Sequence, residues 1–283
     1  MWENRIRVIV INHIIILLLF LSVGFSQKVY DINHIVLQNG VYIKKFSDEI
    51  VNGKVFQMYG DIKVPLGKMK DGKKEGKWMV WYDNGTKEEE QNYKDGKKNG
   101  LGTWWYENGK KLSEGTYKDG KEDGLGILWY ENGKKQVQGT FNDDGRRDGL
   151  WTEWYENGQK KSEGKFEDDK KDDLWKDYYE NGQLQEEGHY KEGKYEGLWR
   201  RYFDNGILSI KGNYKDDKQD GFWKSYYDNG QLYLDRIYKD GKLEGLWKSY
   251  YDNGQLKYEW NYKEGELISQ ECWDEDGNEK ECD

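Results

Sequence analysis

Aromatic side chains at a fixed spacing are the part of this 283-residue chain that could do binding chemistry. Successive stretches of 24 or 25 residues supply one ring each, and we call these rings the aromatic stripe: Trp81, Trp105, Trp129, Trp154, Tyr178, Tyr202, Tyr226 and Tyr250. Evenly spaced rings on an open surface can stack on sugar rings or anchor a protein partner, because Trp and Tyr are favoured at interface centres. The alternative is that the rings pack along one another and only stabilise their neighbours.

Catalytic chemistry is not indicated by the other residues. The sequence has no arrangement typical of a Ser-His-Asp or Cys-His site, and His34 and His189 are the only histidines after residue 26. The acidic residues fall in expected turns and on expected solvent-facing positions, which is typical of solvated surfaces. Pairs such as Asp168-Asp169 could hold Ca²⁺ loosely, but acidic residues are also favoured in turns. We therefore predict a protein that is not an enzyme and has no cofactor or metal.

The chain has two cysteines, Cys272 and Cys282, close to its end. A three-residue loop at Asp276–Asn278 would place them directly opposite each other in a hairpin, whereas a two-residue loop would leave them one residue out of register. Two thiolates with no histidine nearby are too few ligands for a structural zinc ion. In an exported protein a disulfide is the expected state.

A repeat in the sequence predicts the strands and turns that position these residues. An Asn-Gly pair follows an aromatic doublet eight times, at Asn84, Asn108, Asn132, Asn157, Asn181, Asn205, Asn229 and Asn253. A fixed period of this size is typical of a repeat array. Asn-Gly between alternating runs predicts a two-residue type I′ hairpin turn. A second turn, usually Asp-Gly, lies half a period away, so the sequence predicts an all-β array of 24-residue hairpins.

Counting outward from a two-residue Asn-Gly loop predicts the cross-strand partners. Trp199 would face Gly212, and a large ring over a cross-strand glycine shields bare backbone. The same count pairs the ring before each turn with a leucine: Tyr251 with Leu256, Tyr227 with Leu232, Phe203 with Leu208 and Tyr179 with Leu184. The tryptophans and the tyrosine or phenylalanine at the end of each second strand then share one face, which we expect to be packed.

The opposite face would carry the aromatic stripe and pairs of opposite charge. Lys248 would lie across from Glu259, Lys224 from Asp235 and Lys176 from Glu187. Two repeats have glycine, Gly102 and Gly126, where the others have tryptophan. Trp104 and Leu128 lie two residues further along on the same face, so we expect the packing to be displaced there.

The two ends of the chain differ from the array. Residues 1–26 have a basic start, an apolar run and small residues before Gln27, which predicts a secretory signal peptide; the alternative is an uncleaved membrane anchor. We interpret residues 27–75 as an N-terminal cap with degenerate repeats, residues 76–271 as the array, and residues 272–283 as a capping hairpin.

The net charge is −9, or about −10 without residues 1–26. An acidic chain disfavours nucleic acid and anionic lipid as main partners, because both require a basic surface. The charge therefore also argues against membrane association once the signal peptide is removed.

At its Tyr-Glu-Asn-Gly and Gly-Leu-Trp-Lys-x-Tyr-Tyr motifs the chain resembles the MORN repeat superfamily. It most resembles the bacterial variant whose members are often labelled YwqK-like antitoxin components of toxin–antitoxin systems. The resemblance covers roughly residues 53–283 and implies an elongated, single-layer antiparallel β-meander of stacked hairpins. MORN arrays are linked to scaffolding, protein–protein contacts and membrane association. A signal peptide does not fit a cytosolic antitoxin, and the acidic charge does not fit phospholipid binding.

Together these features predict a non-enzymatic, exported repeat protein, whether periplasmic, on the outer surface or secreted, that presents an extended sheet surface to a protein partner. One alternative is a glycan- or cell-wall-binding module that acts through the aromatic stripe. The other is an antitoxin or immunity protein that sequesters a toxin.

Overall fold

The computed structural model describes residues 27–282, nearly all of which lie in strands or in the turns between them. The predicted signal peptide, residues 1–26, lies outside the described residues. The described residues form two compact units, which divide between Met79 and Val80, within strand β6. The elements up to the division are β1 (Val29–Asp31), the 3-10 helix η1 (Ile32–His34), β2 (Ile35–Gln38), β3 (Val41–Lys44), β4 (Gly53–Tyr59), β5 (Ile62–Lys70) and β6 (Lys73–Trp81).

The second unit continues with strands alone among its described residues. They are β7 (Lys87–Lys94), β8 (Lys97–Trp105), β9 (Lys111–Lys118), β10 (Lys121–Trp129), β11 (Lys135–Phe141), β12 (Gly149–Trp154), β13 (Lys160–Glu167), β14 (Lys170–Tyr178), β15 (Leu184–Lys191), β16 (Lys194–Tyr202), β17 (Leu208–Lys215), β18 (Lys218–Tyr226), β19 (Leu232–Lys239), β20 (Lys242–Leu243), β21 (Gly245–Tyr250), β22 (Leu256–Lys263), β23 (Glu266–Trp273) and β24 (Glu279–Lys280).

The first unit is not a pure antiparallel meander. β4, β5 and β6 pair antiparallel in chain order, but β1 pairs parallel to β4. β2 and β3 form a separate hairpin around Asn39 and Gly40, whose φ angles of 49° and 79° are those of a type I′ turn. The other Asn-Gly pair of this unit, Asn52-Gly53, is not a turn, because Gly53 is the first residue of β4.

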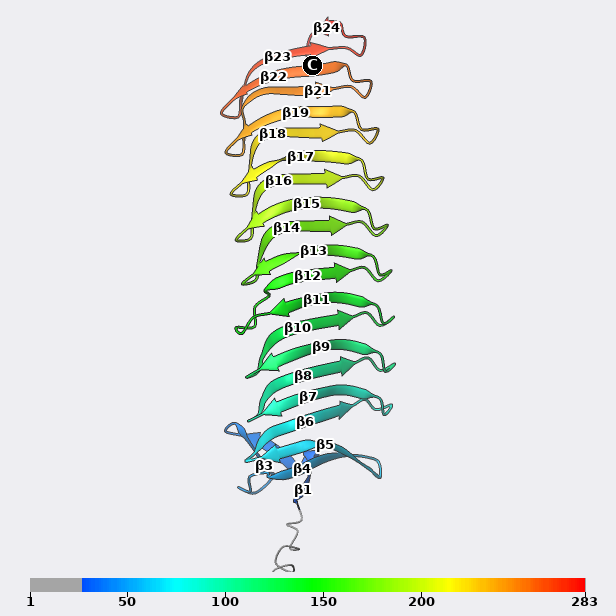
Figure 1. The fold of residues 1–283 in the computed structure, drawn as a ribbon, viewed down its shortest axis with the longest axis vertical. Coiled ribbons are helices and arrows are strands. Elements are labelled where there is room, and N and C mark those ends of the chain that lie inside the picture. Colours follow the sequence, from blue (N-terminus) through cyan, green and yellow to red (C-terminus); the bar gives the residue numbers. More distant parts are fainter. Residues whose placement is uncertain (1–26, 283) are drawn as a thin grey trace, which may run out of the picture. The chain divides into compact units, whose positions relative to one another are not determined.

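The second unit is the predicted antiparallel β-meander. From β7 to β24 the strands pair antiparallel with their neighbours in chain order, in one layer, except that β20 and β21 both pair with β19 (Figure 1). The predicted register is confirmed in the middle of the hairpins, where Trp199 pairs with Gly212 and Trp247 with Trp260. The local sequence therefore specifies both the strands and their pairing over most of their length.

The Asn-Gly turns are not the predicted two-residue type I′ turns. At Asn253-Gly254 only the glycine has a positive φ, 86°. The Tyr251 N–H donates to the Gln255 carbonyl at 2.8 Å, which leaves a three-residue loop. An irregularity then shifts the register before the middle of the hairpin, so Leu256 pairs with Tyr250. The predicted Tyr251–Leu256 pairing is therefore wrong by one residue, as are the three others derived from the same count, Tyr227–Leu232, Phe203–Leu208 and Tyr179–Leu184.

The asparagine of this turn acts through its side chain. The Asn253 carboxamide oxygen accepts from the Gln255 N–H at 2.8 Å, and its nitrogen donates to the Glu275 carbonyl in the next hairpin at 3.3 Å. The first bond is the local side-chain-to-backbone contact that makes asparagine favourable in turns. The second bond joins one repeat to the next. It is therefore a further reason why asparagine is favoured at this position, in addition to the conformation of the turn.

The type I′ geometry occurs instead at the other turn of each repeat. Asp240 and Gly241 have φ angles of 50° and 84°, and Lys239 pairs with Lys242 across this two-residue loop. Asp217 replaces the glycine in one repeat and keeps a φ of 64°. Its carboxylate accepts from the Tyr195 N–H at 2.8 Å, a contact that offsets part of the strain of the left-handed conformation.

The face predicted to be packed carries a ladder of edge-to-face rings. Trp223 is the most buried of them, with 1% of its surface exposed. The contacts that make the ladder have ring-centroid distances of 4.8 to 6.5 Å and join Phe141–Trp151, Trp151–Phe166, Phe166–Trp175, Trp175–Tyr190, Trp199–Tyr214, Tyr214–Trp223 and Trp223–Tyr238. Such pairs stabilise beyond the area they bury. We call this side the ladder face.

A bend in every second strand helps to bury the ladder in a single layer. β16 bends at Gly197, which has a φ of 82°, and its register to β15 shifts at the same place. Rings from beyond the bend then lie against the ladder, since Tyr195 is 4.5 Å from Tyr190 and 4.9 Å from Tyr214 between ring centroids. Glycine is favoured at the bend because it adopts positive φ without steric cost.

The tyrosine before each Asn-Gly turn joins neighbouring hairpins. The Tyr227 hydroxyl donates to the Tyr250 carbonyl of the next hairpin at 2.7 Å. The same bond is made by Tyr82, Tyr106, Tyr130, Tyr155, Tyr179 and Tyr251. Phe203 stands at this position in one repeat and has no hydroxyl to donate. Sequence reasoning placed these rings correctly near the turn but missed their contact with the next repeat.

Phe203→Tyr should therefore raise the free energy of unfolding by about 0.5–1.5 kcal/mol, the usual net contribution of one hydrogen bond. The new hydroxyl would donate to the Tyr226 carbonyl, just as the Tyr227 hydroxyl donates to the Tyr250 carbonyl one repeat later. Urea titration followed by circular dichroism measures the change. Tyr227→Phe is the matched control and should lower stability by a similar amount. Equal stability of all three proteins would show that these bonds do not stabilise the stack.

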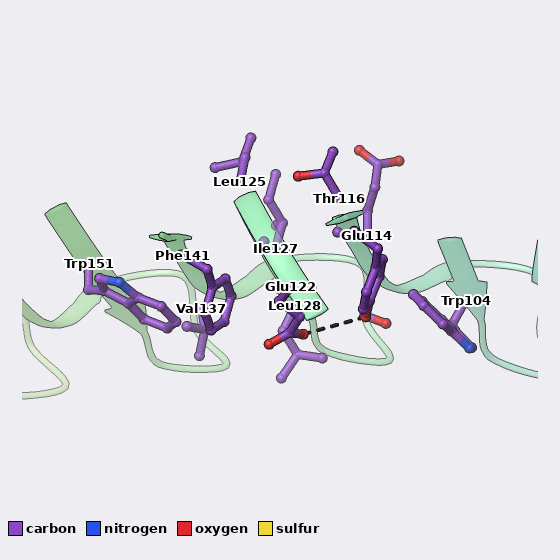
Figure 2. Close-up of a pocket in the computed structure, with 14 residues that line it drawn as sticks. Trp104, Glu114, Thr116, Glu122, Leu125, Ile127, Leu128, Val137, Phe141 and Trp151 are labelled. Carbon is purple, nitrogen blue, oxygen red and sulfur yellow. Dashed lines mark hydrogen bonds between the residues drawn. The ribbon is translucent and has the colours of Figure 1, made fainter. Parts of the chain in front are cut away.

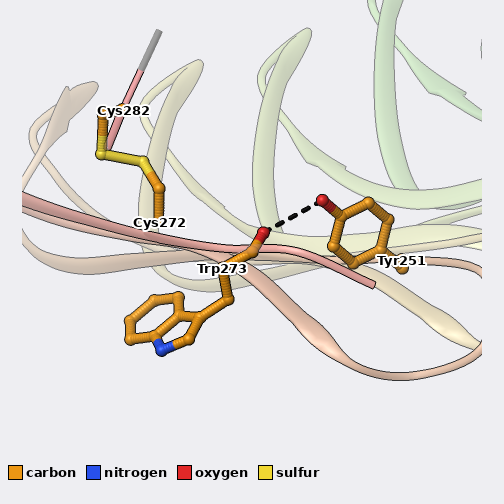
Figure 3. The surroundings of a disulfide bond; sticks show 4 residues. All are labelled: Tyr251, Cys272, Trp273 and Cys282. Carbon is orange, nitrogen blue, oxygen red and sulfur yellow. Dashed lines mark hydrogen bonds between the residues drawn. A yellow bond between two sulfur atoms is a disulfide. The ribbon is translucent and has the colours of Figure 1, made fainter. Parts of the chain in front are cut away.

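The predicted disulfide joins Cys272 and Cys282, with a Cα–Cα distance of 5.4 Å (Figure 3). The predicted register is not the one found. The loop is again a three-residue one, but it starts one residue earlier, since the Asp274 N–H donates to the Asn278 carbonyl. Cys272 pairs with Lys280, and Cys282 lies two residues beyond it, after the end of β24. A cross-link from this position is compatible with an oxidising compartment.

Candidate functional site

The aromatic stripe lies along one edge of the second unit's strands. Each of its rings is the last residue of a strand, from Trp81 at the end of β6 to Tyr250 at the end of β21, and all eight are half-buried. Side chains alternate between the two faces along a strand, and Tyr250 is three positions after Trp247 in β21. The stripe rings therefore lie on the side opposite the ladder face. We call this side the stripe face.

Lysines lie over the tryptophans of the stripe. The Lys87 ammonium is 5.0 Å from the centroid of the Trp105 ring, and Lys111 is 5.4 Å from that of Trp129. Each lysine is also paired with a carboxylate, as in Lys87–Glu90 at 2.6 Å. Cation–π contacts at exposed sites contribute about 0.5–1 kcal/mol. The tryptophan half of the stripe is therefore a mixed surface of rings and charges rather than a bare row of rings.

Two tyrosines of the stripe are hydrogen-bonded to carboxylates. The Tyr178 hydroxyl donates to Glu163 at 2.6 Å, and the Tyr202 hydroxyl donates to Glu187 at 3.2 Å. Burial and the adjacent Glu163 carboxylate raise the pKa of Tyr178. Hydrogen bonds from Lys160 and Tyr178 lower the pKa of Glu163, which keeps this carboxylate charged. These side chains are held in defined positions before any partner binds.

The predicted charge pairs have the predicted register. Lys248 and Glu259 are 2.7 Å apart, and Lys224 and Asp235 are 3.1 Å apart. Lys176 lies opposite Glu187 in the strand register, as predicted. The Glu187 carboxylate, however, forms its 2.7 Å ion pair with Arg200 of the next hairpin. Exposed pairs of this kind contribute about 0–1 kcal/mol each. Their main effect is to order the surface between the rings.

A second apolar column on the stripe face was missed by the sequence analysis. It consists of the residue before each tryptophan position, namely Leu101, Leu125, Leu150, Leu174, Leu198, Phe222 and Leu246. Leu150 and Phe222 are 66% and 64% exposed, and Leu101, Leu125 and Leu246 are also exposed. The fixed spacing of these residues could have revealed the column. They were treated as part of the repeat motif, although their parity places them opposite the packed tryptophans.

The two apolar columns border a groove on the stripe face. Its volume is about 440 Å³, and its lining includes Leu198 and Phe222 from one column and Tyr202 from the other. Arg200 and Lys224 line it as well. Large exposed apolar side chains that continue over several strands are typical of an interaction surface.

Eight segments of the chain match the sequence model of the MORN repeat variant: residues 74–95, 98–119, 122–143, 147–168, 174–192, 195–216, 219–240 and 243–264. They make up more than half of the chain. The chain belongs to the MORN repeat variant family. Matched segments such as residues 195–216 run from one Asp-Gly-type turn to the next, so a MORN repeat here is one hairpin with the Asn-Gly turn at its centre. The match does not test the YwqK-like antitoxin subtype, which stays a prediction.

Other comparisons add little to the family assignment. A search of curated proteins gives no match. One similar solved structure, "Crystal Structure of TcdB2-TccC3-Cdc42", has 11% sequence identity and a TM-score of 0.20, and the match covers 84% of this chain but only 15% of that chain. The chain thus spans a small part of that much longer protein, and a likeness this weak carries no argument on function.

Among the described residues, 27–282, no group of three or more His, Cys, Asp or Glu side chains could hold a metal ion. His189 is exposed. No helix among the described residues is long and apolar enough to cross a membrane.

Proposed function

We propose that this MORN-repeat protein is a non-enzymatic, exported protein that binds another protein through its stripe face. The exposed apolar column beside the aromatic stripe is the observation that carries the proposal. Apolar side chains as exposed as Leu150 and Phe222 are usually covered by a partner when they recur along one surface. Trp and Tyr in the adjacent stripe are the residue types that most often dominate binding energy at interfaces.

Charge supports a protein partner. Ion pairs such as Lys248–Glu259 and Lys224–Asp235 alternate with the apolar residues, and charges at the rim of an interface select partners and set their register. A net charge of −9 opposes nucleic acid and anionic membranes. Lysines over Trp105 and Trp129 also occupy ring surface that a sugar would need for stacking.

Export is proposed from two features. Residues 1–26 have the composition of a signal peptide, and the Cys272–Cys282 disulfide is compatible with an oxidising compartment. An immunity or antitoxin role would be one form of the same protein-binding activity, with a toxin as the partner.

The test is a pull-down from envelope and culture fractions with the full chain and two variants. Trp154→Ala/Tyr178→Ala/Tyr202→Ala removes three stripe rings, and Leu150→Ser/Phe222→Ser removes the two most exposed residues of the apolar column. We expect each variant to weaken capture of the main protein partner at least about 30-fold, which corresponds to 2 kcal/mol of interface energy. Quantitative mass spectrometry measures the captured protein.

The matched control is Trp154→Phe/Tyr178→Phe/Tyr202→Phe, which keeps the rings and should keep most of the binding. Thermal melts of every variant separate loss of the surface from loss of the fold, and exposed substitutions such as Leu150→Ser should cost little stability. Unchanged capture by both variants would refute the proposal. Recovery of polysaccharide without protein would replace it with the glycan-binding alternative.

A further inference from the structure

A row of four glycines crosses four adjacent strands of the ladder face. Gly102 of β8 pairs with Gly115 of β9, Gly115 with Gly126 of β10, and Gly126 with Gly139 of β11. Gly102 and Gly126 stand where the other repeats have tryptophan. A bare strip of backbone of this width must be covered by neighbouring side chains or left open.

The other repeats show what normally covers such a glycine. Trp151 lies over Gly139 so closely that a Cβ on the glycine would be 2.2 Å from the indole, and Trp175 covers Gly164 in the same way. The indole N–H donates to the carbonyl of the residue after the glycine, as Trp151 does to Thr140 at 3.0 Å. Trp175 and Trp223 make the same bond. Each glycine is thus the floor of a slot that one indole fills.

The slot over Gly115 has no indole of its own, because its partner on the next strand is Gly126. A Cβ on Gly115 would contact only Tyr117, at 3.7 Å, whereas Gly102 is covered by Gln91 and Trp104, and Gly126 by the edge of Phe141. The ring contacts of the described residues also stop here. Trp104 and Tyr117 form one pair, and the ladder restarts at Phe141. The expected displacement of Trp104 and Leu128 toward the missing positions therefore does not close the slot.

A cavity of about 220 Å³ lies at this place, with Trp104, Tyr117, Leu128, Val137, Phe141 and Trp151 in its lining. Trp104, Phe141 and Trp151 lie on the same side of the sheet, opposite Leu125 (Figure 2). Burial raises the pKa of Tyr117 to about 12, in keeping with apolar surroundings. Its hydroxyl points to Glu122 at 3.4 Å.

We infer that this cavity is a binding site for one tryptophan side chain presented by a protein partner. The size fits, because a cavity of roughly 150 Å³ holds a benzene ring, while sites for drug-sized ligands begin at about 300 Å³. The walls are rings that can meet an indole edge to face. The Thr116 carbonyl occupies the place of the Thr140 carbonyl, which accepts from Trp151, so an acceptor for the indole N–H is already in position.

The equivalence of these two carbonyls rests on a second shared contact. Thr140 donates its hydroxyl to the Asp148 carbonyl, and Thr116 donates its hydroxyl to the Asp123 carbonyl one repeat earlier. The slot is on the ladder face and the proposed protein-binding surface is on the stripe face. The inference therefore does not depend on the proposed function.

The test is a ¹⁹F NMR titration of the full chain with N-acetyl-5-fluorotryptophanamide, which carries the side chain on a peptide-like backbone. We expect a Kd on the order of 1 mM, as suits a single side chain without the rest of an interface. N-acetyl-4-fluorophenylalaninamide should bind at least about 10-fold more weakly, because it is smaller and has no N–H to donate.

Gly115→Leu should abolish this binding, since Gly115 lacks a positive φ and a side chain there would project into the slot. Gly126→Trp supplies the missing indole within the chain and should also abolish binding, with a rise in melting temperature, so the test does not depend on one variant. Leu246→Ala, in the exposed apolar column of the stripe face and outside the lining of the cavity, should leave the titration unchanged.

Failure to bind at several millimolar probe, or binding that both filling variants retain, would overturn the inference. Binding of free 5-fluoroindole without binding of the amide would also overturn it, because the site would then take a small molecule and not a side chain. The stripe-face variants should bind the probe normally, so loss of the proposed function and loss of this site are distinguishable.

Discussion

Trp223→Ala should lower the free energy of unfolding by about 3–5 kcal/mol, the usual cost of removing a buried tryptophan. Trp223 contacts Trp199, Tyr214 and Tyr238, and its indole lies over Gly212. Its N–H also donates to the Asn213 carbonyl at 3.1 Å. Because the sheet has a single layer, no second sheet can fill the space that alanine would leave. Urea titration followed by circular dichroism and tryptophan fluorescence measures the change.

Tyr226→Ala is the matched control for this substitution. Tyr226 lies in the same strand, three residues further on, but belongs to the stripe face and is only half-buried. We expect its removal to cost about 1 kcal/mol, within the usual range for a partly exposed residue. Equal losses for the two variants would show that the two faces contribute alike to stability and would contradict the assignment of a packed side and a binding side.

Removing the disulfide should destabilise the C-terminal hairpin by about 2–3 kcal/mol, the loop-closure entropy expected for a loop of about ten residues. Cys272 is buried, with 1% of its surface exposed, and β24 contributes only Glu279 and Lys280 to the sheet. With so few ladder hydrogen bonds, the last strand depends on the cross-link. Hydrogen exchange of β23 and β24 in Cys272→Ala/Cys282→Ala measures the local effect.

Reduction of the native chain with dithiothreitol controls for the lost side-chain packing, because it breaks the cross-link and keeps both sulfurs. Both treatments should speed exchange in β23 and β24 and leave the amides of β14 to β18 unaffected, since repeats contact only their neighbours. Uniform loss of protection along the array would contradict this local account.

Much of the fold could be predicted because the information is local. A period of 24 residues with turn residues at each half-period specifies hairpins, and the alternation of side chains assigns Trp199 and Tyr202 to opposite faces. The cross-strand pairing of Trp199 with Gly212 was predicted by counting along one hairpin. The charge pair Lys248–Glu259 followed from the same count.

The turns were harder to predict, because the backbone preference of Asn-Gly competes with the hydrogen bonds that the asparagine side chain can make. Asn-Gly is typical of a type I′ turn and is found as one at Asn39-Gly40, but in the repeats the asparagine side chain caps the loop and bonds to the next hairpin. That contact exists only when another repeat is stacked beside the turn. The register around Cys272 also differs from the predicted one, because the loop that follows Cys272 begins one residue earlier than predicted.

By itself, the sequence determined the repeat, the strands, the two faces and the pairing of Cys272 with Cys282, because each depends on residues within one hairpin. The tertiary structure alone decided what happens between hairpins: the tyrosine hydroxyl bonds such as Tyr227 to Tyr250, the exposure of Leu150 and Phe222, and the open slot over Gly115. The physical reason is that a repeat buries its side chains against its neighbours, so exposure, inter-repeat bonds and vacancies become visible only when the hairpins are placed side by side.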